Sequence, residues 1–271
     1  MATSTSPSPT RAAPVVLDAH SLIEVLETVV RGHLASPTSI VVVCSSKEDF
    51  VDSLQRDVLE DTKQAMGSST NPIDVEMANA GETRSGDHLR RAADHHLLQP
   101  TIHMLASATD LKMAFCPSTA HTLAYLANLS AHAFDKSQER SGSGLGMGSS
   151  PLSSLFILNP VAQHEGTRSY SAQGLTRFFS TAVSTANAIR SKLIIAECRD
   201  IPVRPIEDEG DLWAVVDAEN AATRSPWDEQ VAITNVKVKG AATRDPTWQG
   251  RTVSLRAVAE KWCTFEKLSG S

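Results

Sequence analysis

Two short apolar runs that flank one long amphipathic segment constrain the fold of this chain more than any other feature. Residues 155–158 are wholly apolar, too short for a helix and followed by Asn159, while residues 193–196 form the second run. Between the runs, apolar residues recur from Leu175 at i+3, i+4, i+7, i+8 and i+11, which is the spacing of one helix face. Because parallel strands need a long connection, this order predicts a strand, a crossover helix and a parallel strand.

The same succession of helices and apolar strands precedes this unit. Ser21 and Glu24 have the spacing of a capping box ahead of an apolar stripe, which predicts a helix. Residues 39–44 form a β-branched apolar run typical of a strand buried in a parallel sheet, and Ser46 is placed to cap a second helix. A strand at residues 111–116, followed by another amphipathic helix, completes the predicted series.

The C-terminal part has a different pattern. Apolar and polar residues alternate over 231–239 and 252–256, and a third segment, 261–265, resembles them. Alternation of this kind is typical of antiparallel strands with one solvated face. The predicted fold class is therefore α/β, with a mostly parallel central sheet, flanking helices and a C-terminal antiparallel extension.

The length of 271 residues is compatible with one domain that carries insertions. We expect a disordered tail at residues 1–14 and a single domain over 15–271. Gly, Ser, Thr, Asn and charged residues dominate two stretches, about 64–94 and 137–151, which are predicted to be disordered insertions.

Composition excludes some classes of protein. No apolar run approaches the roughly 20 residues of a membrane-spanning helix, so no membrane partner is expected. The net charge of -6 argues against a protein that binds nucleic acid over its whole surface, although a local basic face is compatible with it. The four cysteines form no CxxC pair, which favours buried free thiols in a reducing, intracellular compartment.

The order of elements resembles the RecA-like recombinase superfamily. In that family a central strand carries the Walker B motif, and a loop, a long helix, a further strand and a C-terminal antiparallel hairpin follow. Residues 155–159 stand where the Walker B strand would be, and 170–175 resemble the loop that enters the long helix. The resemblance covers the chain loosely from about residue 21 to residue 268 and implies a RecA-like mostly parallel sheet.

The residues that carry out nucleotide chemistry in that family are missing from this chain. An active member needs GxxxxGK followed by Ser or Thr, in which amides and a lysine hold the phosphates, and no Gly-Lys-Ser or Gly-Lys-Thr occurs in the chain. Asn159 stands at the Walker B aspartate position, and an amide has no charge with which to hold magnesium. We therefore expect no ATP hydrolysis, no catalytic residues and no cofactor.

Glu197, at the end of the following strand, is predicted to be a solvated carboxylate, with a relic of a catalytic glutamate as the alternative. Four histidines lie nearest one another, but they lack the spacings of a zinc site, so no metal centre is expected. They are His88, His95, His96 and His103.

Several basic and aromatic residues are candidate contacts to nucleic acid or to a partner subunit, because cations on one face bind phosphates. The alternative is that strands with one solvated face simply display lysines there. The candidates are Arg168, Tyr170 and Arg177 after the Walker B position, and Lys237, Lys239, Arg251 and Arg256 in the C-terminal part.

The resemblance implies a non-catalytic recombinase paralogue similar to Walker-less subunits of the Shu complex. Such a nuclear subunit would associate with other RecA-like subunits, with DNA as a further candidate partner, and assist homologous recombination and DNA repair. The first alternative is a cytoplasmic subunit resembling the RecA-like ring of Elongator, which serves tRNA modification. The second is a divergent doubly wound α/β enzyme.

Overall fold

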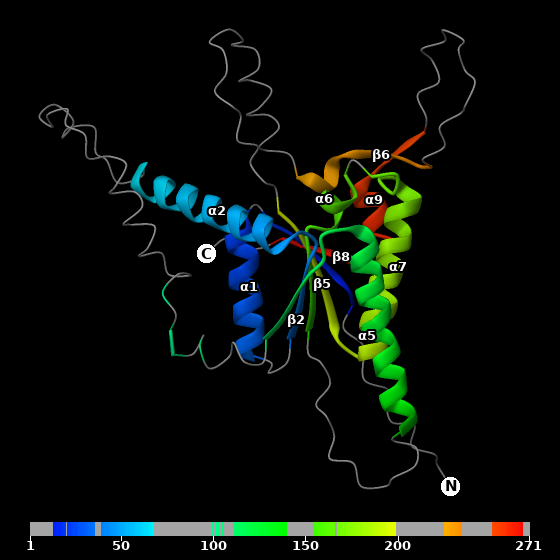
Figure 1. Ribbon diagram of the computed structural model, residues 1–271. Helices are drawn as coiled ribbons and strands as arrows, with labels where there is room; N and C mark the ends of the chain where they lie inside the picture. The colour runs from blue at the N-terminus through cyan, green and yellow to red at the C-terminus, as the bar shows by residue number, and fades with distance from the viewer. Residues whose placement is uncertain are drawn as a thin grey trace, which may run out of the picture.

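Figure 1 shows the computed structural model of the chain. The residues that the structure describes are 13–19, 21–35, 39–67, 99, 101, 102, 105, 111–139, 154–165, 167–198, 225–234 and 251–267. The predicted tail at 1–14 and most of the predicted insertions at 64–94 and 137–151 lie outside these residues. At the start of those insertions, residues 64–67 and 137–139 are the last residues of two helices.

A six-stranded sheet forms the centre of the molecule. Its strands are β1 (Val15–Asp18), β2 (Ser39–Val43), β3 (Leu111–Phe115), β4 (Ser154–Leu158), β5 (Lys192–Glu197) and β8 (Thr264–Lys267). They lie in the order β3-β2-β4-β5-β1-β8, and every pairing in this sheet is parallel. All residues of β2 and β4 are buried, which explains why their sequences are continuously apolar rather than alternating.

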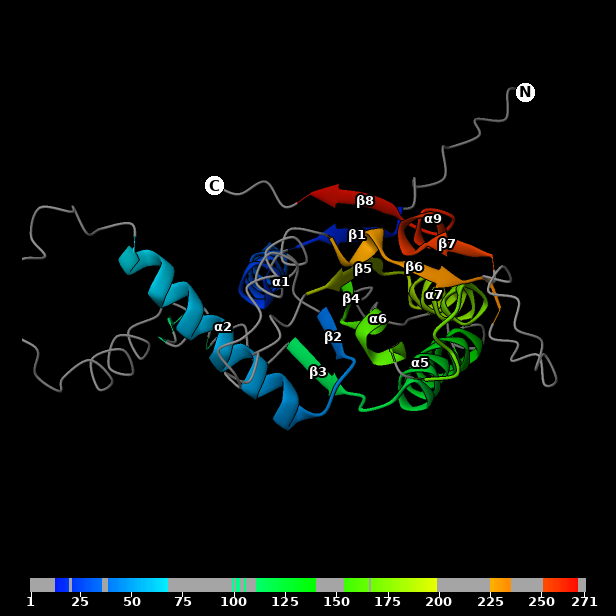
Figure 2. The ribbon, with the colours of Figure 1, turned by 90° about the horizontal axis from the view of Figure 1, so that it is seen from above.

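Helices cover both faces of the sheet, as the view from above shows (Figure 2). On one face lie α1 (Leu22–Ala35) and α2 (Lys47–Gly67), and on the other lie α5 (Thr119–Glu139) and α7 (Ala172–Ile189). A short helix, α6 (Pro160–His164), follows β4 directly. The predicted unit of strand, long helix and parallel strand is confirmed as β4, α7 and β5.

Alternate residues of each strand enter different hydrophobic cores. Val16 of β1 packs in the core beneath α5 and α7, which includes Phe178 and Phe179, whereas Val15 packs in the core beneath α1. This two-sided burial follows from the period of two residues in a strand. The sheet is therefore the shared wall of two apolar layers.

The C-terminal part forms a small unit over the first turns of α7. It consists of the 3-10 helix η2 (Pro226–Asp228), the strands β6 (Gln230–Ala232) and β7 (Thr252–Ser254), and the helix α9 (Leu255–Ala259). Trp227 is fully buried between Phe179 and Phe265, with ring centroids 6.5 and 5.3 Å away. This aromatic contact joins the small unit to both α7 and the sheet.

The antiparallel extension is only partly as predicted. β6 and β7 pair antiparallel, as expected, although the described pairing spans three residues of each strand. The prediction for residues 261–265 is wrong, because β8 instead joins the main sheet parallel to β1. The prediction of a strand over residues 252–256 also fails at its end, since Ser254 caps α9 by accepting a hydrogen bond from the Ala257 amide.

Candidate functional site

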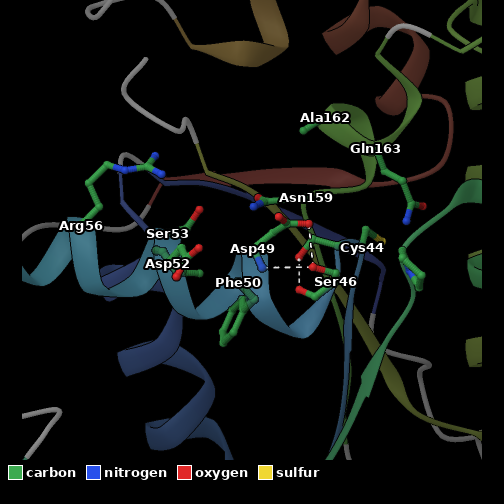
Figure 3. A pocket seen from close by; sticks show the side chains of 13 residues that line it. Cys44, Ser46, Asp49, Phe50, Asp52, Ser53, Arg56, Asn159, Ala162 and Gln163 are labelled. Carbon is green, nitrogen blue, oxygen red and sulfur yellow. Dashed lines mark hydrogen bonds between the residues drawn. The ribbon is translucent and has the colours of Figure 1, made fainter. Parts of the chain in front are cut away.

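A cavity lies where the chain leaves the sheet in opposite directions. From β2 the chain passes through α2 to β3, and from β4 it passes through α6 and α7 to β5 on the other side. Open α/β sheets bind ligands in the crevice at such a switch point, outside the carboxyl ends of the strands. Figure 3 shows this cavity of about 430 Å³, which is walled by the first turns of α2, Leu22, Asn159 and α6.

The N-terminus of α1 borders this cavity and is closed by the protein itself. The Leu22 amide donates to Oδ2 of Asp57, a residue of α2, at 2.8 Å, and the Glu24 amide donates to the Ser21 hydroxyl at 3.3 Å. A carboxylate thus occupies the place where the free amides of a helix N-terminus would bind an anion.

The connection from β1 to α1 is also short. β1 ends at Asp18 and α1 begins at Leu22, so only residues 19–21 join them. A Walker A motif needs a loop several residues longer to wrap around phosphates. This connection is therefore too short for a phosphate loop, and the amides of Leu22 and Glu24 are already bonded to side chains of the protein.

Asn159 joins the ends of two neighbouring strands. Its backbone has φ 55° and ψ 44°, a left-handed conformation that asparagine tolerates better than most residues. Its Oδ1 accepts a hydrogen bond from the Cys198 amide at 2.8 Å, and its own amide donates to the Ala196 carbonyl at 2.8 Å. The asparagine is therefore suited to a structural task that links β4 to β5.

The prediction that Glu197 is a solvated carboxylate is wrong. Glu197 is 3% exposed, and its two oxygens accept hydrogen bonds from the amides of Val161 and Ala162, each at 2.8 Å. The carboxylate caps the first turn of α6, where backbone amides would otherwise be unsatisfied. Its burial follows from the position of α6 directly over the end of β5.

Gln163 forms the wall of the cavity nearest α5. Its amide nitrogen donates to the Cys116 carbonyl, and its Oε1 accepts from the Thr122 hydroxyl at 2.8 Å. Burial raises the pKa of the Cys44 thiol above its ordinary range and also raises that of Cys116. These cysteines are therefore thiols at neutral pH, unsuited to act as nucleophiles.

All four cysteines are buried and free, as predicted. Burial raises the pKa of Cys263 to about 12, so this thiol also stays protonated. Within the described residues, no group of three or more His, Cys, Asp or Glu side chains could hold a metal ion. The histidines 88, 95, 96 and 103 lie outside those residues.

The structure brings several of the candidate contact residues together at the start of α7. Arg168 and Arg177 are exposed, and Tyr170 is half-buried beside Glu229; burial, and then this carboxylate, raise the pKa of Tyr170 above its usual range. The tip of the small C-terminal unit reaches the same place through two backbone hydrogen bonds. The Gln173 amide donates to the Ile233 carbonyl at 3.2 Å, and the Ile233 amide donates to the carbonyl of exposed Arg251 at 3.0 Å.

Two of the predicted contact residues, Lys237 and Lys239, lie outside the described residues. Arg256 lies elsewhere, on α9, and makes intramolecular ion pairs. Its guanidinium is 3.2 Å from Asp18 and 3.3 Å from Asp228, and it stacks 4.4 Å from the Phe265 ring centre. The ion pair between Arg256 and Asp18 therefore joins the small C-terminal unit to the end of β1.

Asp57 is one of the residues at this site that the sequence does not predict. It follows Leu54 at i+3 and precedes Val58, so it lies beside the apolar stripe of the helix and is half-buried. Its partner Leu22 is 35 residues away, and no local motif joins the two. The burial of Glu197 was missed for the same reason, because its partners are on another element. In both cases the contact arises from the tertiary arrangement of the elements, and no residue pattern in the sequence indicates it.

Comparison with protein-family models, with curated proteins and with solved structures finds no match to this chain. Among the described residues, no helix is both long and apolar enough to cross a bilayer.

Proposed function

We propose that this protein is a non-catalytic RecA-like subunit of a complex that assists homologous recombination and DNA repair. The observation that carries the proposal is the closed N-terminus of α1, where Asp57 takes the Leu22 amide that a phosphate would need. A domain built this way keeps a doubly wound frame while it lacks the means to bind and cleave a nucleotide.

The order of elements supports the RecA-like part of the proposal. In that family a loop, a long helix and a further strand follow the Walker B strand, and here α6, α7 and β5 follow β4. Asn159 then falls at the Walker B position, where its amide bonds to Cys198 in place of holding a metal.

The recombination context rests on the surface at the start of α7. Arg168 and Arg177 are exposed just before α7 and in its second turn, and the backbone of exposed Arg251 is joined to the start of α7 through Ile233. Exposed cations here could bind the phosphates of DNA, although exposed Glu165 and Glu229 make the surface mixed in charge. Partner RecA-like subunits would pack against the nucleotide edge, which this protein no longer uses for catalysis.

The proposal is tested with the purified full chain and forked or single-stranded DNA, by fluorescence anisotropy at rising salt. Binding should weaken as salt rises, and Arg168→Glu with Arg177→Glu should weaken it about tenfold or more, because phosphate contacts are lost. The matched control is Arg31→Glu on α1, which pairs with Glu27 on the opposite face of the sheet. Arg256 is left intact, since reversing its charge would break its ion pairs with Asp18 and Asp228.

Affinity purification followed by mass spectrometry gives the second half of the test. Recovery of RecA-like recombination proteins would support the proposal. Salt-insensitive or absent DNA binding, with Elongator-like partners and a tRNA-modification defect on deletion, would refute it in favour of the ring-subunit alternative.

A further inference from the structure

The cavity at the switch point has polar groups for which the fold gives no use. Three of its side chains, Asp49, Asp52 and Arg56, come from one face of α2, at spacings of three and four residues. Asn159 contributes from the end of β4, across the cavity (Figure 3). The volume of about 430 Å³ lies within the range of roughly 300–1,000 Å³ that is usual for small-molecule sites.

Hydrogen-bond donors are left over on both walls. In the part of the chain that the structure describes, the half-buried guanidinium of Arg56 has neither an ion-pair nor a hydrogen-bond partner. The Oδ1 atom of Asn159 is engaged by Cys198, which leaves its Nδ2 group directed away from that bond and without a partner in the same described part. Guanidinium and amide N–H groups that face one cavity bind an oxyanion best.

Acceptors lie beside these donors. The Asp49 carboxylate accepts the Ser46 hydroxyl at 2.7 Å and has further lone pairs, and Asp52 is exposed at the rim. Two carboxylates would repel a bare anion, so the ligand must bring hydroxyl or ammonium donors next to its acidic group. This combination excludes inorganic phosphate as a good fit and favours a small hydroxylated acid.

We propose that the cavity between α2 and the β4–α6 junction binds a small polyhydroxylated anion, with its acidic group on Arg56 and Asn159 and its hydroxyls on Asp49 and Asp52. The site does not depend on the recombination proposal, because none of these residues belongs to the α7 surface. It also differs from the closed N-terminus of α1, although Leu22 borders both.

The test is a titration of the full chain by calorimetry and by amide chemical shifts. The probes are ribose 5-phosphate and gluconate, which carry a phosphate and a carboxylate, with neutral ribose and inorganic phosphate as controls. At least one of the two hydroxylated acids should bind saturably in the range of about 1 mM or tighter, and the shifts should include the Asn159 side-chain amide. The acid that binds identifies the anionic group.

Arg56→Gln should raise the Kd about tenfold, whereas Arg31→Gln, which removes the same charge from α1, should leave it unchanged. Arg56→Lys keeps the charge without the planar fork, and its partial loss of affinity would separate recognition from a folding defect. The proposal is overturned if neither acid binds, if inorganic phosphate binds equally well, or if the Arg56 and Arg31 variants behave alike. DNA binding by the α7 surface would be untouched by any of these results.

Discussion

The hydrogen bond from the Leu22 amide to Asp57 is the contact whose removal tests the closed α1 terminus most sharply. The bond is 2.8 Å long, charge-assisted and half-buried, and it lies at the positive end of a 14-residue helix. Losing a carboxylate from such a position costs about 0.5–2 kcal/mol as a capping effect, and the helix dipole is part of that sum. We expect Asp57→Ala to lower the free energy of unfolding by about 1.5 kcal/mol.

The assay is urea unfolding followed by circular dichroism, with a thermal scan alongside. A loss of about 1.5 kcal/mol corresponds to a fall in Tm of about 3–6 °C for a chain of this size. Asp57→Asn keeps an acceptor oxygen and should lose about half as much. The control is Asp52→Ala, which removes an exposed carboxylate five residues earlier on the same helix and should cost less than about 0.5 kcal/mol. Equal losses for Asp57→Ala and Asp52→Ala would refute the assignment of Asp57 as the cap of α1.

Three further perturbations test other contacts of the fold. Trp227→Ala should lower the free energy of unfolding, measured in urea, by about 3–5 kcal/mol, because a fully buried indole between Phe179 and Phe265 is lost. A loss below about 1 kcal/mol, which is typical of a surface substitution, would contradict that packing. Burial lowers the pKa of His164 below its ordinary value of about 6.5, so the neutral side chain contributes stability above that pH, and this contribution is lost as the pH falls below it. His164→Gln should therefore flatten the dependence of the unfolding free energy on pH between about pH 7 and 5. An unchanged slope would contradict this role of His164. Asn159→Ala should lower the free energy of unfolding by about 2 kcal/mol, because the bond to Cys198 is lost and alanine is strained in a left-handed conformation. Asn159→Gly should lower it by about half as much, since glycine adopts that conformation without strain. A larger loss for glycine than for alanine would contradict the importance of backbone strain at this position.

Elements with strong periodicity are predictable from the chain, because a strand buried on both faces is continuously apolar and a helix on the sheet has one apolar stripe. β2, β4, β5 and α7 are continuous with the apolar runs and stripes that predicted them. The sequence pattern does not predict β1 and β8 as strands of the main sheet. Each has four residues, and β8 has an edge position with charged, exposed residues that imitate an antiparallel strand with one solvated face.

The candidate site was harder to predict than the fold. Asn159 was located because a polar residue ends a buried strand, but the partners that define its role arise from the juxtaposition of β4 and β5. Arg56 reads in the sequence as one more cation on a solvated helix face, and only the approach of α2 to the end of β4 places it in a cavity. Contacts between residues distant in the chain leave no local sequence pattern, so only the tertiary structure identifies them.

Calorimetric titration with ATP and magnesium tests most directly the proposal that this chain is a RecA-like subunit without nucleotide chemistry. Wild-type protein and the Asn159→Asp variant, which introduces a carboxylate where the proposal puts the Walker B aspartate, should be compared at equal concentration. We expect no magnesium-dependent binding tighter than about 1 mM for either protein, and no release of phosphate, because a carboxylate at position 159 cannot replace a phosphate loop and its lysine. Magnesium-dependent binding in the micromolar range by the wild-type protein would contradict it.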